Sequence, residues 1–123
     1  MTGALSGSGT LDGDVLDGDV LADLLTLGDA VVALLPDHDV AFRAGLVELG
    51  AAAAAGAAPQ VERLAHSLKG SSACMAARQV AARCAGIQAD AAHGRCPRPT
   101  ELAALHAEHE RAVSALQRVL GTA

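Results

Sequence analysis

Apolar residues recur every three or four positions along most of the chain, which is the spacing of one face of an α-helix. No segment shows a sustained two-residue alternation of apolar and polar side chains, so the pattern gives no sign of strands. Short connections join the periodic segments, which favours antiparallel neighbours. The pattern therefore predicts an all-α fold: an antiparallel (up-down) four-helix bundle with a short additional N-terminal helix.

A chain of 123 residues is long enough for one domain with one hydrophobic core. Its hydrophobic residues, 51% of the total, are largely Ala and Leu, and Phe42 is the one aromatic residue of the Phe, Trp and Tyr class. Small aliphatic side chains favour close packing of helices over sheets. Residues 1–10 are rich in Gly, Ser and Thr, so we expect a flexible tail there and a single domain over 11–123.

A tandem repeat, LDGDV, occupies residues 11–20. We do not expect a calcium-binding loop, because Leu16 stands where an oxygen ligand belongs and the closing glutamate is missing. Instead, Asp17 or Asp19 is expected to cap a short helix that ends near Gly28. The residues of this helix expected to face inward are Val20, Leu21, Leu24 and Leu27.

Residues 30–55 carry a helical pattern that contains Pro36. Proline either breaks this segment into two helices or kinks one long helix, and the pattern does not distinguish the two. If the helix restarts, Asp37 or Asp39 is the expected cap. The inward positions of its second part are Phe42, Leu46, Leu49 and Ala53.

Three more helices are predicted in the C-terminal half. The first follows a turn over 56–58 and has Pro59 in its first turn, with an inward stripe of Val61, Leu64, Leu68 and Met75. The second follows a bend near 73–76 and ends at Gly94, and its inward residues are Val80, Cys84, Ile87 and Ala91. The third starts near Thr100, and its inward stripe is Leu102, Leu105, Val113, Leu116 and Leu120.

Charge and cysteine content narrow the function classes. The formal charge is -5 at pH 7, with no basic block and almost no aromatic rings, which argues against nucleic-acid binding. The three cysteines are odd in number and form no C-x-x-C pair, as is typical of a reducing compartment. No signal peptide or membrane span is visible, so we expect a cytoplasmic protein with no membrane partner.

His66 is the main candidate for chemistry, because its helix is expected to turn it away from the core. On a helical wheel counted from Leu64, His66 lies roughly 200° around, with Lys69 at about 140° and Gly70 at about 240°. Lys69 can reach an anion held on the imidazole, and Gly70 leaves the backbone uncovered beside it. Glycine inside a helix costs about 1 kcal/mol relative to alanine, and close approach of another molecule would explain its presence.

The run AHSLKGSS over 65–72 resembles the signature of histidine-containing phosphotransfer (HPt) domains, A-H-x-L-K-G-S-S/A. The resemblance extends over about residues 16–120. It implies that His66 is phosphorylated and that Lys69 steadies the phosphoryl group. The implied docking face comprises Glu62, Gly70 and Ala73. The resemblance also implies that Ser67, Ser71 and Ser72 are supporting residues of the motif.

Three positions depart from the family pattern. Cys74 stands where asparagine is frequent, Ala76 where glycine is frequent, and Gln88 where glutamate is common. Cys84, in contrast, fits a position that is often small or cysteine. The departures leave the histidine, lysine and glycine of the motif intact, so they affect the expected partner preference more than the expected chemistry.

By this resemblance the protein is a histidine phosphocarrier, which accepts a phosphoryl group from the phosphoaspartate of a receiver domain and passes it to another receiver. The receiver would supply both the aspartate and Mg²⁺, so the chain is expected to be no enzyme and to hold no cofactor or metal of its own. The implied partners are response-regulator receiver domains and a (hybrid) sensor histidine kinase, and the chain is expected to be a monomer. The alternative is a non-phosphorylated helical docking module that binds a receiver or another regulatory partner.

Other sites find less support in the sequence. His93-x-x-Cys96 and His106-x-x-His109 have spacings seen in zinc sites, but the second pair falls on or beside an inward stripe, which favours partly buried histidines with hydrogen-bond partners. His38 has no organised neighbours in the sequence and is expected to be solvated or to lie early in a helix. There is no Gly-rich phosphate loop and no G-x-S-x-G elbow, so neither an ATP site nor a serine hydrolase is indicated.

Overall fold

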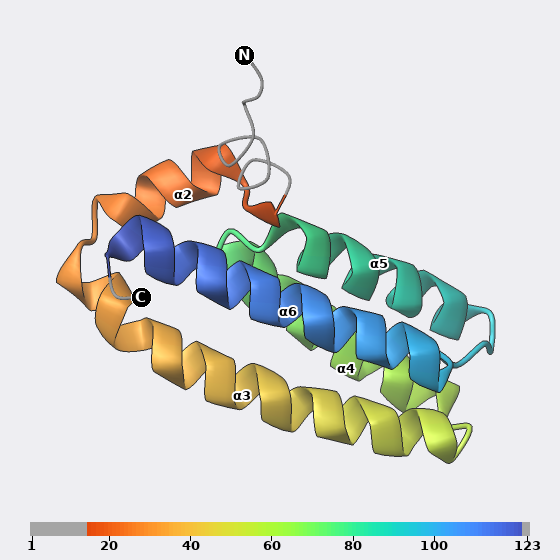
Figure 1. Cartoon of the computed structure of the whole chain (residues 1–123). Helices are drawn as coiled ribbons and strands as arrows, with labels where there is room; N and C mark the ends of the chain where they lie inside the picture. Colours follow the sequence, from red (N-terminus) through yellow and green to blue (C-terminus); the bar gives the residue numbers. More distant parts are fainter. Residues whose placement is uncertain (1–14, 122–123) are drawn as a thin grey trace.

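The computed structural model describes residues 15–121 (Figure 1), and the tail expected over 1–10 lies outside this range. The described residues form five α-helices and no strands: α2 (Gly18–Leu25), α3 (Asp29–Ala54), α4 (Ala58–Cys74), α5 (Arg78–Ala92) and α6 (Pro99–Leu120). The all-helical class predicted from the sequence is therefore confirmed.

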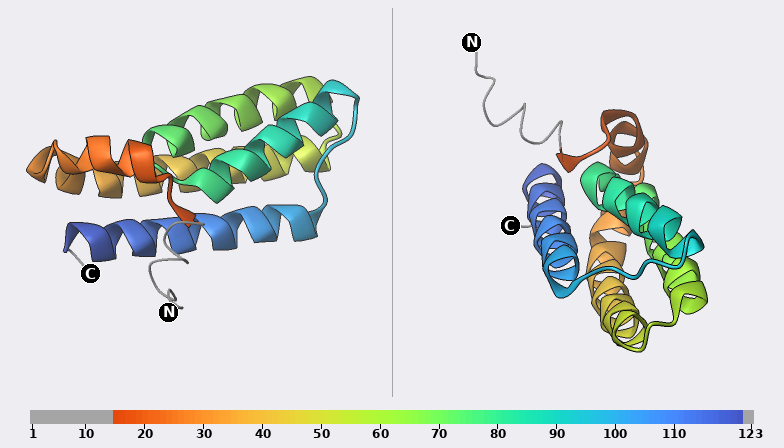
Figure 2. Two further views of the ribbon diagram at one scale, coloured as in Figure 1. Left: turned by 90° about the horizontal axis from the view of Figure 1, so that it is seen from above. Right: turned by 90° about the vertical axis from the view of Figure 1, so that its right-hand side faces the viewer.

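The helices α3 to α6 enclose one core. In Figure 1 the colour gradient along each helix shows that successive helices run in opposite directions, and Figure 2 shows the four from above and from one end. Helix α3 contacts α4 and α6, and α5 also contacts both α4 and α6. The largest fully buried side chains include Phe42 and Leu49 from α3 and Leu105 and Leu116 from α6.

Helix α3 continues through Pro36 without a break. Proline removes one backbone hydrogen bond from a helix interior, so the continuity needs support from packing. Val31 and Leu35 are buried before the proline and Phe42 is buried after it, so both parts of the helix face the same core. The prediction that Asp37 or Asp39 caps a second helix is therefore inapplicable, because no new helix starts there.

The residues just before α2 form backbone hydrogen bonds with the turn between α4 and α5. Asp17 caps the helix, and its Oδ1 accepts hydrogen bonds from the backbone N–H groups of Asp19 and Val20 at 3.0 and 3.1 Å. The backbone N–H of Asp17 donates to the carbonyl of Ala76 at 2.7 Å, and Leu16 forms an isolated antiparallel bridge with Ala77. One of the two expected caps, Asp17, is thus confirmed.

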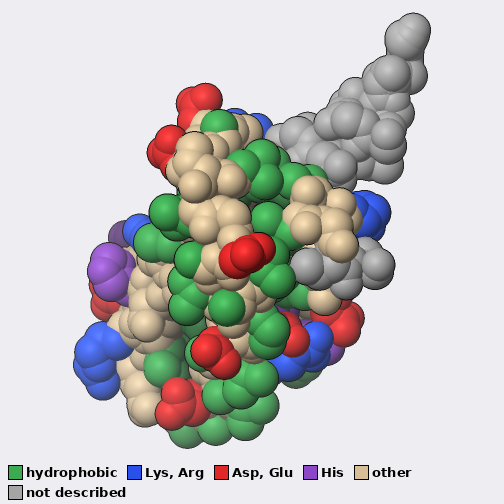
Figure 3. All heavy atoms as spheres, turned by 90° about the vertical axis from the view of Figure 1, so that its left-hand side faces the viewer, with side chains coloured by type: hydrophobic (Ala, Val, Ile, Leu, Met, Phe, Trp, Pro, Cys, Tyr) green, Lys and Arg blue, Asp and Glu red, His purple; other side chains and the backbone are tan. Residues whose placement is uncertain are grey.

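The expectation that Leu27 faces inward is wrong. Helix α2 ends at Leu25, so Leu27 lies in the turn before Gly28 and is 56% exposed. Leu25 and Leu34 are also about half exposed, at 46% and 55%. These three residues belong to α2, to α3 and to the turn between them. Figure 3 shows hydrophobic side chains gathered on this end of the molecule. The other three predicted residues of α2, Val20, Leu21 and Leu24, are half-buried.

The inward stripes of the later helices follow the predicted spacing. All four predicted residues of α5 are buried: Val80, Cys84, Ile87 and Ala91. On α4, Val61 and Leu68 are buried and Leu64 is half-buried, while Met75 is buried as the C-cap residue. On α6, Leu105 and Leu116 are fully buried and the remaining stripe residues are half-buried. Among the described residues, no helix is long and apolar enough to cross a membrane.

Candidate functional site

His66 lies in the middle of α4 on the exposed side of the helix. Its neighbours Ala65 and Leu68 are buried in the core, and the 3.6-residue period of the helix turns the imidazole away from them. The outward orientation expected from the sequence is therefore what the fold produces.

Gln88 of α5 reaches across to His66. Its side-chain nitrogen Nε2 lies 3.2 Å from Nδ1 of the imidazole, a contact between residues 22 positions apart. The α4–α5 contact, the most extensive between helices of this molecule, brings the two side chains together. In the sequence, Gln88 stands out only as a departure from the family pattern. Its spacing four residues after the buried Cys84 was the available signal that it lies near α4.

Two charged side chains flank His66 on its own helix. Glu62, four residues before, and Lys69, three residues after, are both half-buried, and residues at these spacings share a helix face. Within the described residues, no hydrogen bond or ion pair involves Lys69. Its ammonium group is therefore available to an anion that approaches His66.

Two small residues, Gly70 and Ala73, follow His66 on the same face of α4. Gly70 and Ala73 are both exposed, and a Cβ atom built on Gly70 would meet no atom within 4 Å. Packing among residues 15–121 therefore does not require a glycine at position 70. The open space above the helix at this point leaves room for a partner's atoms.

The three serines of the motif occupy different environments. Ser67 and Ser71 are exposed, and the Ser71 hydroxyl donates to the carbonyl of Leu68 at 3.2 Å. Ser72 is fully buried, and its hydroxyl has no partner among the described residues. Ser72 therefore belongs to the core side of α4, whereas Ser67 and Ser71 border the exposed face.

The departures noted in the sequence lie beneath or beside this face. Cys74 is exposed at the last residue of α4. Ala76 is buried and adopts a left-handed conformation with φ of 62°, which glycine adopts at lower cost. Cys84 is fully buried, and its burial, with the nearby Glu108 charge, raises the pKa of its thiol to about 12. Cys84 is therefore a core side chain whose thiol resists ionisation.

The residues with zinc-like spacing, His93, Cys96, His106 and His109, are not brought together around one point in the structure. The Nδ1–H of His93 donates to the Ala89 carbonyl of its own helix at 2.9 Å, and His106 Nε2 accepts from Arg43 at 3.0 Å. Cys96 is half-buried in the loop before α6. Among the described residues, no group of three His, Cys, Asp or Glu side chains is arranged to hold a metal ion.

His109 is fully buried between α3 and α6, and its Nε2–H donates to the Asp39 carboxylate at 2.7 Å. Its ring stacks on Phe42 with centroids 4.0 Å apart, and its Nδ1 has no partner. Burial lowers the pKa of His109, although the hydrogen bond to Asp39 opposes this effect. His38 lies in α3 and is half-buried, and the expectation that it has no organised neighbours is wrong: its ring lies 5.7 Å from that of His109, and burial lowers its pKa.

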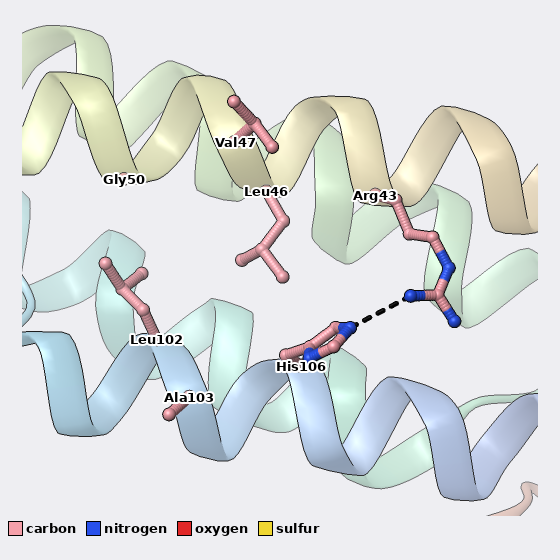
Figure 4. Close-up of a pocket in the computed structure, with 7 residues that line it drawn as sticks. All are labelled: Arg43, Leu46, Val47, Gly50, Leu102, Ala103 and His106. Atoms are coloured by element: carbon pink, nitrogen blue, oxygen red, sulfur yellow. Dashed lines mark hydrogen bonds between the residues drawn. The ribbon is translucent and has the colours of Figure 1, made fainter.

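An apolar groove of about 460 Å³ runs between α3 and α6 (Figure 4). The hydrogen bond between Arg43 and His106 lies at one end of it. The other lining residues are Leu46, Val47, Gly50, Leu102 and Ala103. Neither His66 nor any other residue of the run 65–72 lines this groove, so we do not assign it to the chemistry of His66.

The family model for the Hpt domain matches residues 42–118. The match spans more than half of the 123-residue chain and includes α4 with His66. The chain belongs to the Hpt domain family. Neither the curated proteins nor the solved structures include a significant match to it.

Hpt domains act in histidine phosphotransfer within phosphorelays, where they interact with receiver domains and serve as phosphocarriers rather than as catalysts. In this Hpt domain the match begins at Phe42 inside α3, so α2 and the first part of α3 precede it. The residues of the site described above, from Glu62 to Gln88, all lie inside the matched range.

Proposed function

We propose that His66 is the phosphorylated residue, which accepts a phosphoryl group from the phosphoaspartate of one receiver domain and passes it to another. The observation that carries this proposal is the exposure of the His66 ring and the hydrogen-bond partners of its two nitrogens. The imidazole is exposed, its Nδ1 is held by Gln88, and its Nε2 has no partner among the described residues. Nε2 is therefore the nitrogen open to an approaching phosphorus atom.

The transfer needs little from this chain beyond a positioned nucleophile. The lone pair of Nε2 attacks phosphorus in line, the N–P bond forms, and the bond between phosphorus and the aspartate oxygen breaks, so the carboxylate leaves with its electron pair. The neutral imidazole of a histidine side chain is a nucleophile through its unprotonated nitrogen. Lys69 lies three residues after His66 on the same face of α4, and its ammonium group would attract the phosphoryl oxygens.

The partner completes the reaction. We assign the aspartate and the Mg²⁺ that neutralises the phosphoryl charge to the receiver domain, and no cofactor to this chain. The receiver would bind to the surface formed by Glu62, Gly70 and Ala73. Ser67 and Ser71 lie at the border of this surface. The open space over Gly70 supports this assignment, because a receiver must bring its own active site close to Nε2.

The proposal extends to the setting of the protein. We place it in the cytoplasm as a monomer that works with response-regulator receiver domains and a (hybrid) sensor histidine kinase. We also propose that α3 to α6 form the up-down four-helix bundle of the carrier, with α2 as its short additional N-terminal helix. The pairwise helix contacts and the alternating directions seen in Figure 1 support this arrangement.

The test is incubation with a phosphorylated receiver and Mg²⁺. Wild-type protein should take up acid-labile label, and His66→Gln should take up none. Because His66 is exposed, its replacement should change the free energy of unfolding by no more than about 0.5 kcal/mol. His93→Gln is the matched control, because that histidine is also exposed and its side chain hydrogen-bonds to the Ala89 carbonyl of its own helix. It should be labelled like wild type.

Two outcomes would contradict the proposal. Label on the His66→Gln protein would show that a residue other than His66 is phosphorylated. Stable binding of the receiver with no label on wild type would instead support the alternative function, a helical docking module that is not phosphorylated. Binding is measured separately, by calorimetry with the unphosphorylated receiver.

A further inference from the structure

Another cavity, of about 320 Å³, lies between the first half of α3 and the last turns of α6. We call it the Pro36 cavity. It shares no lining residue with the groove of Figure 4. Four of its lining residues are apolar and two are polar: Val32, Leu35, Pro36 and Val113, with Asp39 and Gln117. Apolar walls with a few polar groups are typical of small-ligand sites, and this volume is at the lower end of their range.

Pro36 leaves a backbone acceptor beside this cavity. Proline has no N–H, so Pro36 cannot donate to the carbonyl of Val32, the residue four positions before it in the helix. Val32 and Pro36 both line the cavity. The missing helical hydrogen bond is therefore at the cavity wall, and a ligand that donates a hydrogen bond can replace it.

Asp39 offers a second acceptor. Its Oδ1 accepts from Nε2–H of His109 at 2.7 Å and from Nε–H of Arg43 at 3.0 Å. Both bonds use the same oxygen, and within residues 15–121 no hydrogen bond involves Oδ2. Burial raises the pKa of Asp39, but the hydrogen bonds from His109 and Arg43 lower it more, so the group is a carboxylate near neutral pH. Oδ2 can therefore accept from a ligand.

The charged groups around Asp39 favour a cation. Arg43 is shared between two carboxylates, because its Nη2 also lies 3.5 Å from Oε2 of Glu110. His106 accepts from Arg43 through Nε2, so that nitrogen carries no proton. Two carboxylates thus share one guanidinium.

The two imidazoles near Asp39 add no charge at neutral pH. His109 donates to its carboxylate, and the His38 ring lies 5.7 Å from that of His109. Burial lowers the pKa of each histidine from an ordinary value of 6.5, so both are neutral near pH 7. The group of side chains around Asp39 therefore carries a net negative charge.

We propose that the Pro36 cavity binds a small primary ammonium compound with an apolar body. The ammonium group donates to Oδ2 of Asp39 and to the carbonyl of Val32, and the apolar body contacts the apolar walls. A free carboxylate oxygen and a carbonyl without its helical donor, inside apolar walls, match this class of ligand. The cavity lies between α3 and α6, whereas His66 is on α4 and contacts α5, so the inference does not rest on the proposed phosphotransfer.

The test is a ¹H–¹⁵N NMR titration of the full chain with n-butylammonium, n-butanol and butyrate, which have the same length. The ammonium probe should bind with a Kd on the order of 1 mM, since a ligand of so few atoms cannot bind much more tightly. n-Butanol should bind about tenfold more weakly because it lacks the charge, and butyrate should not bind. The amide signals that shift should be those of residues that line the Pro36 cavity.

Two variants test the carboxylate and the cavity. Asp39→Asn removes the charge, so n-butylammonium should lose its advantage over n-butanol. Asp37→Asn makes the same change two residues away, at an exposed position outside the cavity, and should bind like wild type. Because Asp39 also holds the buried His109, Val113→Phe provides a second test: it leaves that hydrogen bond in place, fills the cavity, and should abolish binding of both probes.

A third variant tests the backbone acceptor. Pro36→Ala gives the Val32 carbonyl a helical donor, so it should raise the melting temperature and weaken binding of n-butylammonium by about fivefold. A stabilised protein that binds the probe less tightly cannot be explained by loss of the fold. Unchanged affinity in Pro36→Ala would overturn the role of the carbonyl.

Four other outcomes would overturn the proposal. Equal binding of n-butylammonium and n-butanol to wild type would show only an apolar pocket. Shifts spread over acidic residues outside the cavity would show unspecific ion pairing, and absence of any shift would show no site. Tighter binding of Nα-acetyllysine methylamide than of n-butylammonium would assign the cavity to a lysine side chain of a protein partner. Phosphorylation of His66 does not enter this test, so the two proposals fail separately.

Discussion

Gly70 is the residue where stability and function make opposite demands. A Cβ at this position would meet nothing within 4 Å, so Gly70→Ala should raise the free energy of unfolding by up to about 1 kcal/mol through helix propensity. Gly70→Gln should leave the fold intact but slow transfer from a receiver by about 10²-fold, since an in-line reaction tolerates little displacement of its partners. Thermal unfolding and transfer rates measure the two effects.

Gly86 supplies the control for this prediction. It is also exposed and helical, and a Cβ built on it also meets nothing within 4 Å, but it lies on α5 two residues before Gln88. Residues two apart on a helix point in nearly opposite directions. Gly86→Gln should therefore transfer like wild type. Equal rates for Gly70→Gln and wild type would show that Gly70 does not lie in the path of the receiver.

Lys69 is expected to tune the reaction without being essential. A partly exposed charge pair contributes on the order of 1 kcal/mol, so Lys69→Ala should slow phosphotransfer about fivefold. Lys69→Arg keeps the positive charge and should recover most of the rate. Rapid-quench measurement of label on His66 checks both variants. If Lys69→Ala transfers the phosphoryl group at the wild-type rate, Lys69 has no role in phosphotransfer and is only a solvated residue.

At the scale of helices, α3 and α4 approach closely at Gly45. A Cβ on Gly45 would lie 2.8 Å from Cδ2 of the buried Leu68, whereas a Cβ on Gly50 of the same helix would make an ordinary 3.8 Å contact with Leu102. Gly50→Ala should therefore stabilise the protein by up to about 1 kcal/mol, as expected from helix propensity. Gly45→Ala should fail to do so, because Leu68 must shift in a packed core.

Chemical denaturation of the two alanine variants checks this prediction. Equal stabilisation by Gly45→Ala and Gly50→Ala would mean that Leu68 moves aside freely and that the close approach of α3 and α4 is not a constraint. Since Leu68 lies two residues after His66 on α4, a loss of packing there would also be expected to broaden the NMR signals of the His66 ring.

Individual helices differ in how well the sequence predicts them. The stripe of α5 could be predicted in full, because its apolar side chains recur at helical spacing among polar and small neighbours. The continuity of α3 could not, since proline normally disfavours a helix interior and only the burial of Val31, Leu35 and Phe42 against one core holds the two parts in line. The inward orientation predicted for Leu27 is wrong because α2 ends at Leu25, two residues before it.

For the molecule as a whole, stability should fall as the pH falls from 7.5 to 5. Burial lowers the pKa of His109 and, together with the nearby His109 charge, that of His38, from an ordinary value of 6.5. The unfolded chain therefore binds more protons below this value, and protons favour unfolding. For Asp39, burial raises the pKa but the hydrogen bonds from His109 and Arg43 lower it more, so its contribution is lost only below about pH 3.8.

Thermal melts at several pH values test this expectation. His109→Gln keeps a side-chain donor for Asp39 but does not titrate, so its melting temperature should fall less between pH 7.5 and 5 than that of wild type. His93→Gln, which removes an exposed histidine, should keep the wild-type pH dependence. Parallel curves for wild type and His109→Gln would show that the buried histidine does not govern acid sensitivity.

The candidate site shows the same division between local and long-range information. The outward direction of His66 follows from the spacing of Ala65 and Leu68 on one helix, so it could be predicted. The contacts of Gln88 with His66 and of His109 with Asp39 join residues 22 and 70 positions apart. Helical periodicity states which face of each helix is inward but not which side chain of another helix lies opposite, so these partners required the fold.

The bridge between Leu16 and Ala77 has a consequence for the order in which the chain assembles. It closes a loop of about 60 residues that contains α2, α3 and α4, and the entropy lost in closing such a loop is recovered only once these helices are in place. The Asp17 amide, which donates to the Ala76 carbonyl, should therefore become protected from exchange with deuterated solvent late in refolding. Its protection would report that the turn following the helix of His66 has reached its final form.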